Sequence, residues 1–266
     1  MIDTHCHFDV VDFAADRNAV AARALAAGVE AIVIPGYLAS LWPQLFSVCA
    51  SLAQPRLFAA PGLHPCYIEQ HEDGHLAELD QLLHSRPDIV AVGEIGLDYY
   101  LTELKAPALK ERQADIFRAQ LRLAAKHRKP VLLHVRKAHQ DVLAILKSEK
   151  FAEGGIVHAY SGGIEEARHY ARLGFKLGIG GPVTYDQARR LRTVVEQMPL
   201  DALVLETDAP DMIPQPHREP GARHTRNSPE FLPAVAAGLA AVRQLPLDTV
   251  LAQTRAGSIS VLRLPL

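Results

Sequence analysis

The sequence predicts a (β/α)8 barrel of the TIM type, formed as a single domain by residues 1–266. Short apolar runs alternate eight times with longer stretches of helical period, which is the pattern of repeated βα units around a parallel sheet. The length also fits, because 266 residues with 48% hydrophobic content can bury the core of one such barrel. No linker or low-complexity segment divides the chain.

Eight runs rich in Val, Ile and Leu predict the strands. They lie at 1–4, continuing into 5–7, and at 31–35, 57–61, 89–93, 131–135, 156–159, 175–179 and 202–206. Stretches rich in Ala, Leu and Arg predict helices near 12–27, 38–53, 75–85, 107–128, 137–149, 163–173, 185–197 and 229–243, with a ninth near 247–261. An open, doubly wound sheet is the alternative, but it usually carries a glycine-rich loop after its first strand. This chain has His5-Cys6-His7-Phe8 there, which favours the barrel.

Composition argues against several classes of protein. No stretch approaches the roughly 18–20 apolar residues that a membrane-spanning helix needs, and the first residues lack the pattern of a secretory signal. The three cysteines, Cys6, Cys49 and Cys66, have no CxxC spacing, so we expect neither a disulfide framework nor a cysteine zinc site. The net charge of −2 gives no general attraction for polyanions, although a local basic patch could hold phosphates. We therefore expect a cytoplasmic monomer with no membrane partner.

Two histidines at the end of the first run are candidate metal ligands. Side chains alternate between the two faces of a strand, so His5 and His7 point the same way while Cys6 points the other. Two imidazoles on one face can close on a single ion. Taken alone, the pair is more readily explained as two histidines in a fraying terminal strand.

Four further polar residues come at the ends of other runs, namely Glu94, His134, His158 and Asp208. The C-terminal ends of barrel strands converge on one face, where active sites are assembled from several strands. Carboxylate and imidazole together suit divalent metals. Each residue alone could be a core histidine, a helix cap or a salt bridge. Six such groups would each need a separate structural explanation, because burying unpaired charge is costly. The sequence therefore predicts a metal centre.

Six motifs in a specific order extend over nearly the whole chain. They are IDTHCHFD (2–9), GLHP (62–65), VGEIGLDYY (92–100), LLHVR (132–136), VHAYSGG (157–163) and LETDAPDM (205–212). These motifs resemble those of TatD-type metal-dependent deoxyribonucleases in the amidohydrolase-like superfamily, and of that family's YjjV-like branch in particular. The resemblance implies a barrel with two divalent metal ions. One ion would be held by His5, His7, Glu94 and Asp208, and the other by Glu94, His134 and His158, with Glu94 as the bridge.

The implied activity is hydrolysis of DNA phosphodiesters, in the manner of a 3'-5' exonuclease or on short single strands. Two cations can deprotonate a water and clamp the attacking and leaving oxygens. Asp208 is the general-base candidate, and Glu94 is the second catalytic residue as the bridge. Glu206 lies on the same strand face as Asp208, where it could support a ligand or make an ordinary polar contact inside the barrel. The ligands allow Zn, Mn or Mg.

Five residues are candidates for holding DNA or another phosphodiester substrate: His64, Arg136, Tyr99, Arg223 and Arg226. His64 could bind phosphate or be a turn histidine, and Arg136 offers a forked donor unless it forms a solvated salt bridge. Tyr99 could stack on a base. The arginines in the long loop 209–228 could close over the scissile phosphate or stay solvated. The basic run 189–192 and the remaining histidines, among them His71, are expected at the surface.

Two other functions remain open. An amidohydrolase-type enzyme acting on C–N or ester bonds of a small metabolite could use the same barrel, since barrels host many chemistries. A basic loop lining the pocket would favour phosphate over such a metabolite. A non-catalytic, metal-stabilised binding protein is the second alternative. The six-residue ligand set with its candidate base argues against it, because a structural metal needs no open position.

Overall fold

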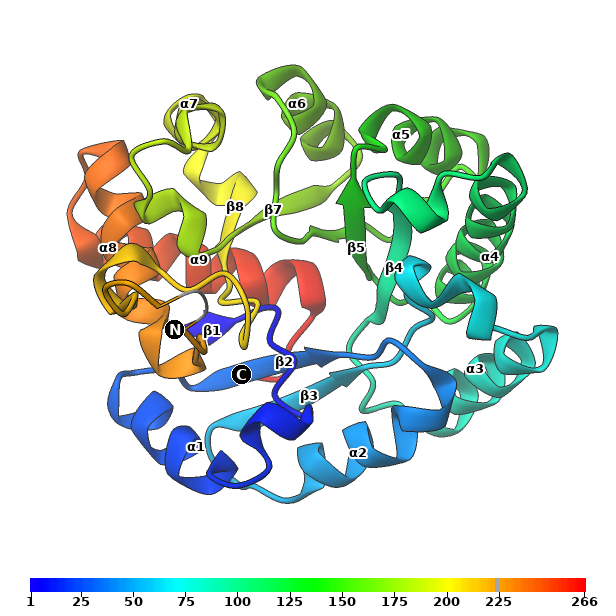
Figure 1. The fold of residues 1–266 in the computed structure, drawn as a ribbon, viewed down its shortest axis with the longest axis horizontal. Coiled ribbons are helices and arrows are strands. Elements are labelled where there is room, and N and C mark those ends of the chain that lie inside the picture. Colours follow the sequence, from blue (N-terminus) through cyan, green and yellow to red (C-terminus); the bar gives the residue numbers. More distant parts are fainter. Residues whose placement is uncertain (223–224) are drawn as a thin grey trace.

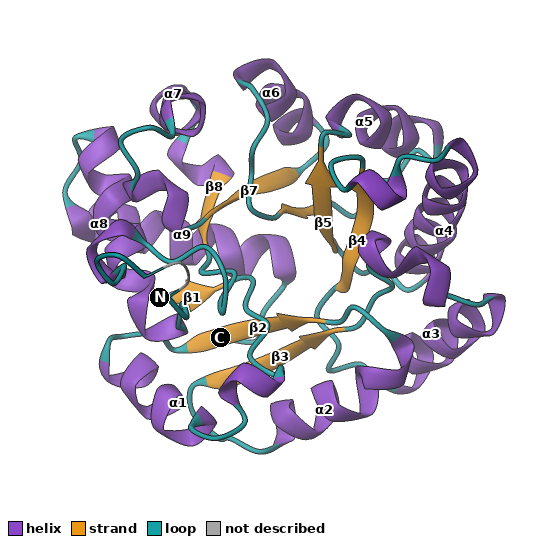
Figure 2. Ribbon diagram, in the orientation of Figure 1, coloured by secondary structure: helices purple, strands orange, loops and turns teal. Residues whose placement is uncertain are grey.

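The computed structural model describes residues 1–222 and 225–266 and has the predicted (β/α)8 barrel (Figure 1). Within these residues, eight parallel strands alternate with helices that form an outer ring (Figure 2). The strands are β1 (Ile2–Asp3), β2 (Ala31–Pro35), β3 (Arg56–Ala60), β4 (Val92–Asp98), β5 (Val131–Arg136), β6 (Gly155–Val157), β7 (Phe175–Ile179) and β8 (Leu203–Leu205). The helices are α1 (Arg17–Ala26), α2 (Trp42–Ala50), α3 (Asp73–Ser85), α4 (Pro107–Lys126), α5 (His139–Ser148), α6 (Ile164–Arg172), α7 (Arg189–Gln197), α8 (Leu232–Arg243) and α9 (Leu247–Leu262).

Backbone hydrogen bonds join two arcs of strands into a closed barrel. β1 to β3 form one arc, and β4 to β8 form the other. At one junction Val90 N donates to Ala59 O over 3.1 Å. At the other junction Asp208 N donates to His5 O over 2.9 Å. Two of the predicted ligands therefore lie on the seam that closes the barrel.

The side chains of each strand point alternately into the barrel and toward the surrounding helices. Leu132, Ile156 and Val204 belong to a buried cluster inside the barrel. Leu133, next to Leu132, belongs instead to the larger cluster that includes the buried faces of the helices. Leu262 of α9 packs into the interior cluster, and α9 lies behind the strands in Figure 1. One end of the barrel is thus filled by apolar side chains and covered by α9.

The fourth strand differs from its predicted bounds of 89–93. Because β4 runs over Val92–Asp98, Glu94 lies inside the strand instead of following it. Ile95 packs outward into the core cluster, so the alternation of the strand continues beyond Glu94. Glu94 and Asp98 consequently share the inward face. The predicted strand therefore ends too early, and the residues from Glu94 to Asp98 keep the alternating orientation of a strand.

The predicted helices are all present in the expected order, and the differences lie mostly at their N-terminal ends. Two of them, α2 and α8, begin directly with a short 3-10 turn, and another such turn lies shortly before α1. These turns are Val11–Phe13 before α1, Ala39–Leu41 before α2 and Pro229–Phe231 before α8. Such turns are frequent at helix termini, and sequence periodicity does not distinguish them from the helix itself.

Among the described residues, no single helix is long and apolar enough to cross a membrane. The adjoining segments Pro229–Arg243 and Leu247–Leu262 reach the required length and hydropathy jointly, across a bend of 112°.

Candidate metal centre

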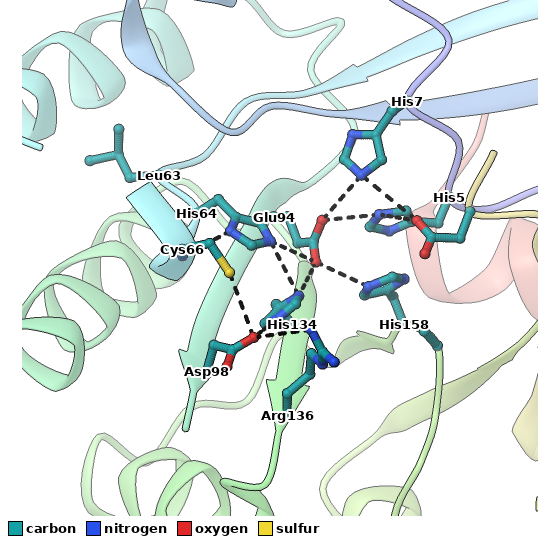
Figure 3. A network of polar contacts seen from close by, with 12 residues as sticks. His5, His7, Leu63, His64, Cys66, Glu94, Asp98, His134, Arg136 and His158 are labelled. Atoms are coloured by element: carbon teal, nitrogen blue, oxygen red, sulfur yellow. Dashed lines mark hydrogen bonds and ion pairs between the residues drawn. The ribbon is translucent and has the colours of Figure 1, made fainter. Parts of the chain in front are cut away.

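The predicted ligands meet at the end of the barrel opposite α9 (Figure 3). His134 and His158 each follow an inward-facing residue, Leu132 and Ile156, by two positions, so strand alternation turns them into the barrel. The six side chains come from five strands or from the residues that follow them: His5, His7, Glu94, His134, His158 and Asp208. The structure therefore brings together every residue that the sequence predicts as a ligand.

Glu94 lies at the centre of this cluster. Its Oε2 is 3.1 Å from His5 Nε2 and 3.6 Å from His7 Nε2. Its Oε1 is 2.6 Å from His134 Nδ1 and 3.0 Å from His158 Nε2. The two oxygens of one buried carboxylate therefore face two different pairs of histidines.

Two sets of side chains have the spacing that a metal ion needs. The ligand atoms of His5, His7 and Asp208 lie within 4.8 Å of one another, and Asp208 Oδ1 is 3.7 Å from each of the two histidines. The second set, with the same spacing, is Glu94, His134 and His158. Two more sets reuse some of these histidines: His5, His158 and Glu206, and His64, Cys66 and His134. Of these four sets among the described residues, the one formed by Glu94, His134 and His158 includes the central carboxylate.

The donor set fits divalent cations. His5 Nε2 and Glu94 Oε2 are buried and only 3.1 Å apart, yet neither has a hydrogen-bond partner among the described residues. Leaving a buried polar atom unsatisfied costs about 1–3 kcal/mol. A cation in contact with both atoms would remove that cost. Imidazole and carboxylate ligands together suit Zn and Mn and also admit Mg.

Burial keeps the imidazoles of the first pair neutral. It lowers the pKa of His5 well below its ordinary value and lowers the pKa of His7 to about 4. A neutral imidazole has a free lone pair on one ring nitrogen, and a metal requires that lone pair. Both side chains are therefore in the metal-binding form at neutral pH.

His134 and His158, on the other side of the central carboxylate, favour the protonated, positively charged form. Burial favours a higher pKa for Glu94, but the surrounding histidines, His158 foremost, hold it well below its usual range. Burial is likewise outweighed at His158, where Glu94 and Asp208 raise the pKa well above its usual value. Against burial, contacts with Asp98 and Glu94 raise the pKa of His134 to about 10. A divalent cation would replace this positive charge, and its binding would release the protons.

Asp208 lies where the cluster opens to solvent. Its side chain is 14% exposed, compared with 1% for Glu94. Burial raises the pKa of Asp208 to about 7, against the opposing charge of His158. A nearby cation would favour its ionised form. Asp208 is thus the carboxylate of this centre that can reach both an ion and a solvent molecule.

Two buried carboxylates hold histidines from behind. Asp98 Oδ2 is 3.0 Å from His134 Nε2, and Glu206 Oε1 is 3.4 Å from His158 Nδ1. Such pairs fix the orientation of a ligand ring and raise its basicity. The position of Glu206 favours the supporting role that the sequence leaves open. Asp98 is not among the residues predicted from the sequence, but its spacing of four residues from Glu94 along one strand is a usable signal.

His64 joins the cluster. Its Nε2 is 3.2 Å from Glu94 Oε1, and its Nδ1 accepts a hydrogen bond from Cys66 N over 3.0 Å. Because Nδ1 accepts, the ring proton lies on Nε2, which makes His64 a donor toward the centre. His71 Nε2 is 2.8 Å from His64 O. His71 is only 1% exposed, so its predicted surface position is wrong.

Arg136 and Tyr99 point in different directions. Arg136 lines the cavity above the cluster, with Nη1 3.7 Å from Asp98 Oδ2 and its guanidinium 4.2 Å from the ring centre of Tyr100. Tyr99 instead has its ring 4.4 Å from the ammonium of Lys110 on α4. Asp98 faces inward, so the next side chain along the strand faces outward. This corrects the predicted substrate contact of Tyr99, and Tyr100 is the tyrosine beside Arg136.

The long loop after β8 does not bring Arg226 to the cavity. Its guanidinium donates to both carboxylate oxygens of Asp16, over 2.9 and 2.7 Å, and lies 4.9 Å from the ring centre of Phe13. A forked contact of this kind is among the stronger ion pairs, so it competes with the predicted closure over substrate. The expected placement of Arg226 is therefore corrected. Arg223, the other arginine predicted in this loop, lies outside the described residues.

A buried carboxylate on β1 positions the segment that carries Asp208. Asp3 accepts hydrogen bonds from Thr207 Oγ1 over 2.6 Å and from Thr207 N over 2.9 Å. Burial raises the pKa of Asp3 to about 8. Asp3 is not among the predicted site residues. A carboxylate two positions before His5, at the start of an apolar run, is the signal that could have identified it.

A cavity of ≈ 460 Å³ opens above the cluster, a volume within the range of small-ligand sites. Five of the six predicted ligands line it, and His5 lies beneath them. Its other lining residues are His64, Val135, Arg136, Ala159, Ser161, Asp211 and Met212. The arrangement can hold cations at its floor and an anionic group beside Arg136.

Known proteins with similar sequences and structures cover the whole barrel. A family model described as TatD related DNase matches residues 2–263. The metal-dependent hydrolase YjjV of Escherichia coli strain K12 is 40% identical over 250 residues, which is 94% of this chain and 92% of that protein. The 3'-5' ssDNA/RNA exonuclease TatD of Erwinia billingiae is 34% identical over 268 residues, with 100% of both chains covered. The crystal structure of the Escherichia coli YjjV protein, a TatD homologue, matches with a TM-score of 0.91 and 37% identity, covering 100% of this chain and 98% of that chain.

Proposed function

Because the chain belongs to the family of TatD related DNases and is a metal-dependent hydrolase, we propose that it hydrolyses phosphodiester bonds of DNA with two divalent cations. Its substrates are single strands, which it cuts from the 3' end, or short single-stranded pieces. The name of the Erwinia billingiae relative, a 3'-5' ssDNA/RNA exonuclease, supports this choice of substrate.

The observation that carries the proposal is the position of Glu94 between two histidine pairs. Its two oxygens contact different pairs at 2.6 to 3.6 Å, which is the arrangement expected of a carboxylate that bridges two cations. One ion would be held by His5, His7, Glu94 and Asp208, and the other by Glu94, His134 and His158. Asp98 and Glu206 would orient His134 and His158 toward their ion.

When bound, divalent cations lower the pKa of a coordinated water and offset the charge that develops on the phosphodiester. Asp208 accepts the proton of the attacking water as the new phosphorus–oxygen bond forms. It then returns this proton to the leaving alkoxide as the old phosphorus–oxygen bond breaks. Its partial exposure at the floor of the cavity allows both transfers.

Two side chains of the cavity can donate to a phosphate. His64 presents an Nε2 proton from the floor, and Arg136 presents its guanidinium from the wall. The stack on Tyr100 and the contact with Asp98 hold Arg136 in place without saturating its five donors. A charged donor aimed at a non-bridging oxygen would bind the scissile phosphate and stabilise its added charge.

Hydrolysis of C–N or ester bonds in a small metabolite is the second candidate, since the same barrel and metals would serve it. The sequence favours phosphate over such a metabolite through Arg223 and Arg226 at the pocket, but Arg226 is bound to Asp16 instead and Arg223 lies outside the described residues. The preference for phosphodiesters now depends on Arg136 and His64, which give the cavity two donors for anionic oxygen.

The proposal is tested with purified protein, stripped of metal and then loaded with Zn, Mn or Mg, on four substrates: single-stranded DNA, RNA, bis-p-nitrophenyl phosphate and a set of cyclic amides. We expect at least one metal to restore phosphodiester cleavage and chelation to abolish it. Degradation of 3'- and 5'-labelled strands gives the polarity. Amide hydrolysis without phosphodiester hydrolysis under every metal would instead establish the second candidate.

Replacing Arg136 with Gln is expected to raise KM for single-stranded DNA by about tenfold or more, because a hydrogen bond between charged groups is lost. Metal content should stay unchanged, since among the described residues Arg136 forms its ion pair with Asp98 and with none of the six proposed ligands. Arg172→Gln on α6 is the matched control, because it removes the same charge from an exposed position. An unchanged KM for Arg136→Gln would remove this residue from the substrate site.

A further inference from the structure

A second cavity of ≈ 260 Å³ adjoins the one above the metal centre. The two cavities share Ala159, Ser161 and Met212, so a ligand can extend from one into the other. The second cavity lies between the segment after β6 and the segment from β7 to α7. Its remaining lining residues are Tyr160, Gly178, Gly180, Pro182, Gln187, Ala188, Arg189, Arg190 and Leu191.

The lining of this cavity combines an apolar floor with two cations. Five of the twelve lining residues are glycine, proline or alanine, whose small side chains leave room for a planar ring. Arg189 and Arg190 line the same cavity, are exposed, and form no ion pair with a carboxylate among the described residues. Arg192 in the same run does have such a neighbour, Asp186 Oδ1 at 4.0 Å. Arg189 and Arg190 are at the surface, as the sequence predicts, and they also line the second cavity.

The order of the strands places Arg136 and the second cavity on either side of His158 along the rim of the barrel. Arg136 ends β5, His158 follows β6, and Arg190 follows β7, and these strands are neighbours in the order β5, β6, β7. A chain of phosphates that passes Arg136 and the centre beside His158 would continue toward Arg190.

We propose that the second cavity is a subsite for the nucleotide next to the scissile phosphate, with its base in the apolar pocket and its other phosphate beside Arg189 and Arg190. This inference depends on the proposed phosphodiesterase function and extends it to a preference for length. The substrate would span at least two phosphodiesters, because a single phosphodiester reaches the metal centre but not the arginines. Bases can stack without sequence specificity, so we expect no strong base preference.

The subsite is tested with Arg189→Gln/Arg190→Gln. We measure binding of a fluorescent trinucleotide phosphorothioate, and hydrolysis of a trinucleotide and of bis-p-nitrophenyl phosphate. The expected results are a loss of about tenfold or more in affinity for the trinucleotide, and a fall of similar size in the ratio of kcat/KM for trinucleotide over small ester. The salt dependence of binding should also weaken, because fewer phosphates are neutralised. Arg172→Gln/Lys150→Gln removes two exposed charges elsewhere and should leave the binding and the ratio unchanged.

A second variant tests the pocket without changing charge. A Cβ at Gly180 would lie 3.6 Å from Glu206 O and 3.8 Å from Pro182 Cδ, which is ordinary contact, so Gly180→Ala should fold and narrow the cavity. Like the double arginine variant, it is expected to lower the affinity for the trinucleotide. Unchanged trinucleotide binding in both variants would overturn the subsite. Failure of the wild type to hydrolyse either phosphodiester under any metal would overturn the proposed function. Because the binding of the trinucleotide analogue is measured without hydrolysis, it tests the subsite separately from the phosphodiesterase function.

Discussion

Glu94→Gln is expected to release at least one of the two proposed cations and to lower kcat by about 10²–10³-fold or more, the range for loss of one electrostatic stabiliser. The carboxylate offers two anionic oxygens, one toward His5 and one toward His134, at 3.1 and 2.6 Å. The amide of Gln has one oxygen acceptor, and its other group is a donor that cannot bind a cation. The two effects are measured on one preparation, by elemental analysis after dialysis and by steady-state kinetics on single-stranded DNA.

The matched control is Glu165→Gln on α6. The Glu165 side chain is 69% exposed and pairs with Arg168 on the same helix, so the same chemical change is made far from the metal centre. It should retain metal content and kcat. Full metal content and full activity in Glu94→Gln would show that this carboxylate does not bridge cations. Circular dichroism of both variants excludes unfolding as the cause of any loss.

The barrel is predictable from the sequence because each strand is a short buried run with turn residues around it. The seventh strand shows this clearly, since the run 175–179 and the observed Phe175–Ile179 coincide. The fourth strand is harder because Gly93 and Gly96 interrupt its apolar pattern. In the fold, a Cβ at Gly96 would lie 2.1 Å from His134 O, so the glycine there allows close approach of β5 and does not end the strand.

The ligands of the proposed centre are predictable for the same reason as the strands. Each is an inward-facing polar residue at or near the end of an apolar run, and closure of the barrel brings these ends together. The resemblance to TatD-type enzymes, confirmed by the family match over residues 2–263, adds the grouping of the ligands. Glu94 is the exception in placement, since it lies inside its strand and still faces the centre.

Three residues lie elsewhere than the sequence predicts, because the contacts that hold them leave no local pattern in the sequence. Arg226 pairs with Asp16, which is 210 positions away in the sequence, so no local pattern indicates that the arginine is already bound. The sequence places Tyr99 at the cavity because it predicts too early an end for β4, and the continued alternation turns this side chain outward. His71 is buried with its ring against the backbone oxygen of His64, and no apolar periodicity in the segment between them indicates this.

Asp208→Asn is expected to retain most of the metal while kcat falls by about 10²–10⁴-fold, the range for loss of general acid–base catalysis. Asn keeps the shape and one oxygen donor but cannot accept a proton near neutral pH. Asp208 is 3.7 Å from both His5 and His7, whereas Glu94 comes within 3.1 Å of His5 and 2.6 Å of His134. The side chain of Asp208 is therefore the more peripheral ligand, and the ion it touches has other partners.

The comparison requires metal content and kcat for Asp208→Asn and Glu94→Gln prepared side by side, with Asp248→Asn, an exposed carboxylate on α9, as the control. Glu94→Gln should lose metal and activity together, whereas Asp208→Asn should lose activity alone. In Asp208→Asn the attacking water can still be bound. Without the carboxylate of Asp208, however, no base accepts the proton of the water and no acid protonates the leaving alkoxide. Full activity in Asp208→Asn would mean that the cations activate the water without a protein base at this position.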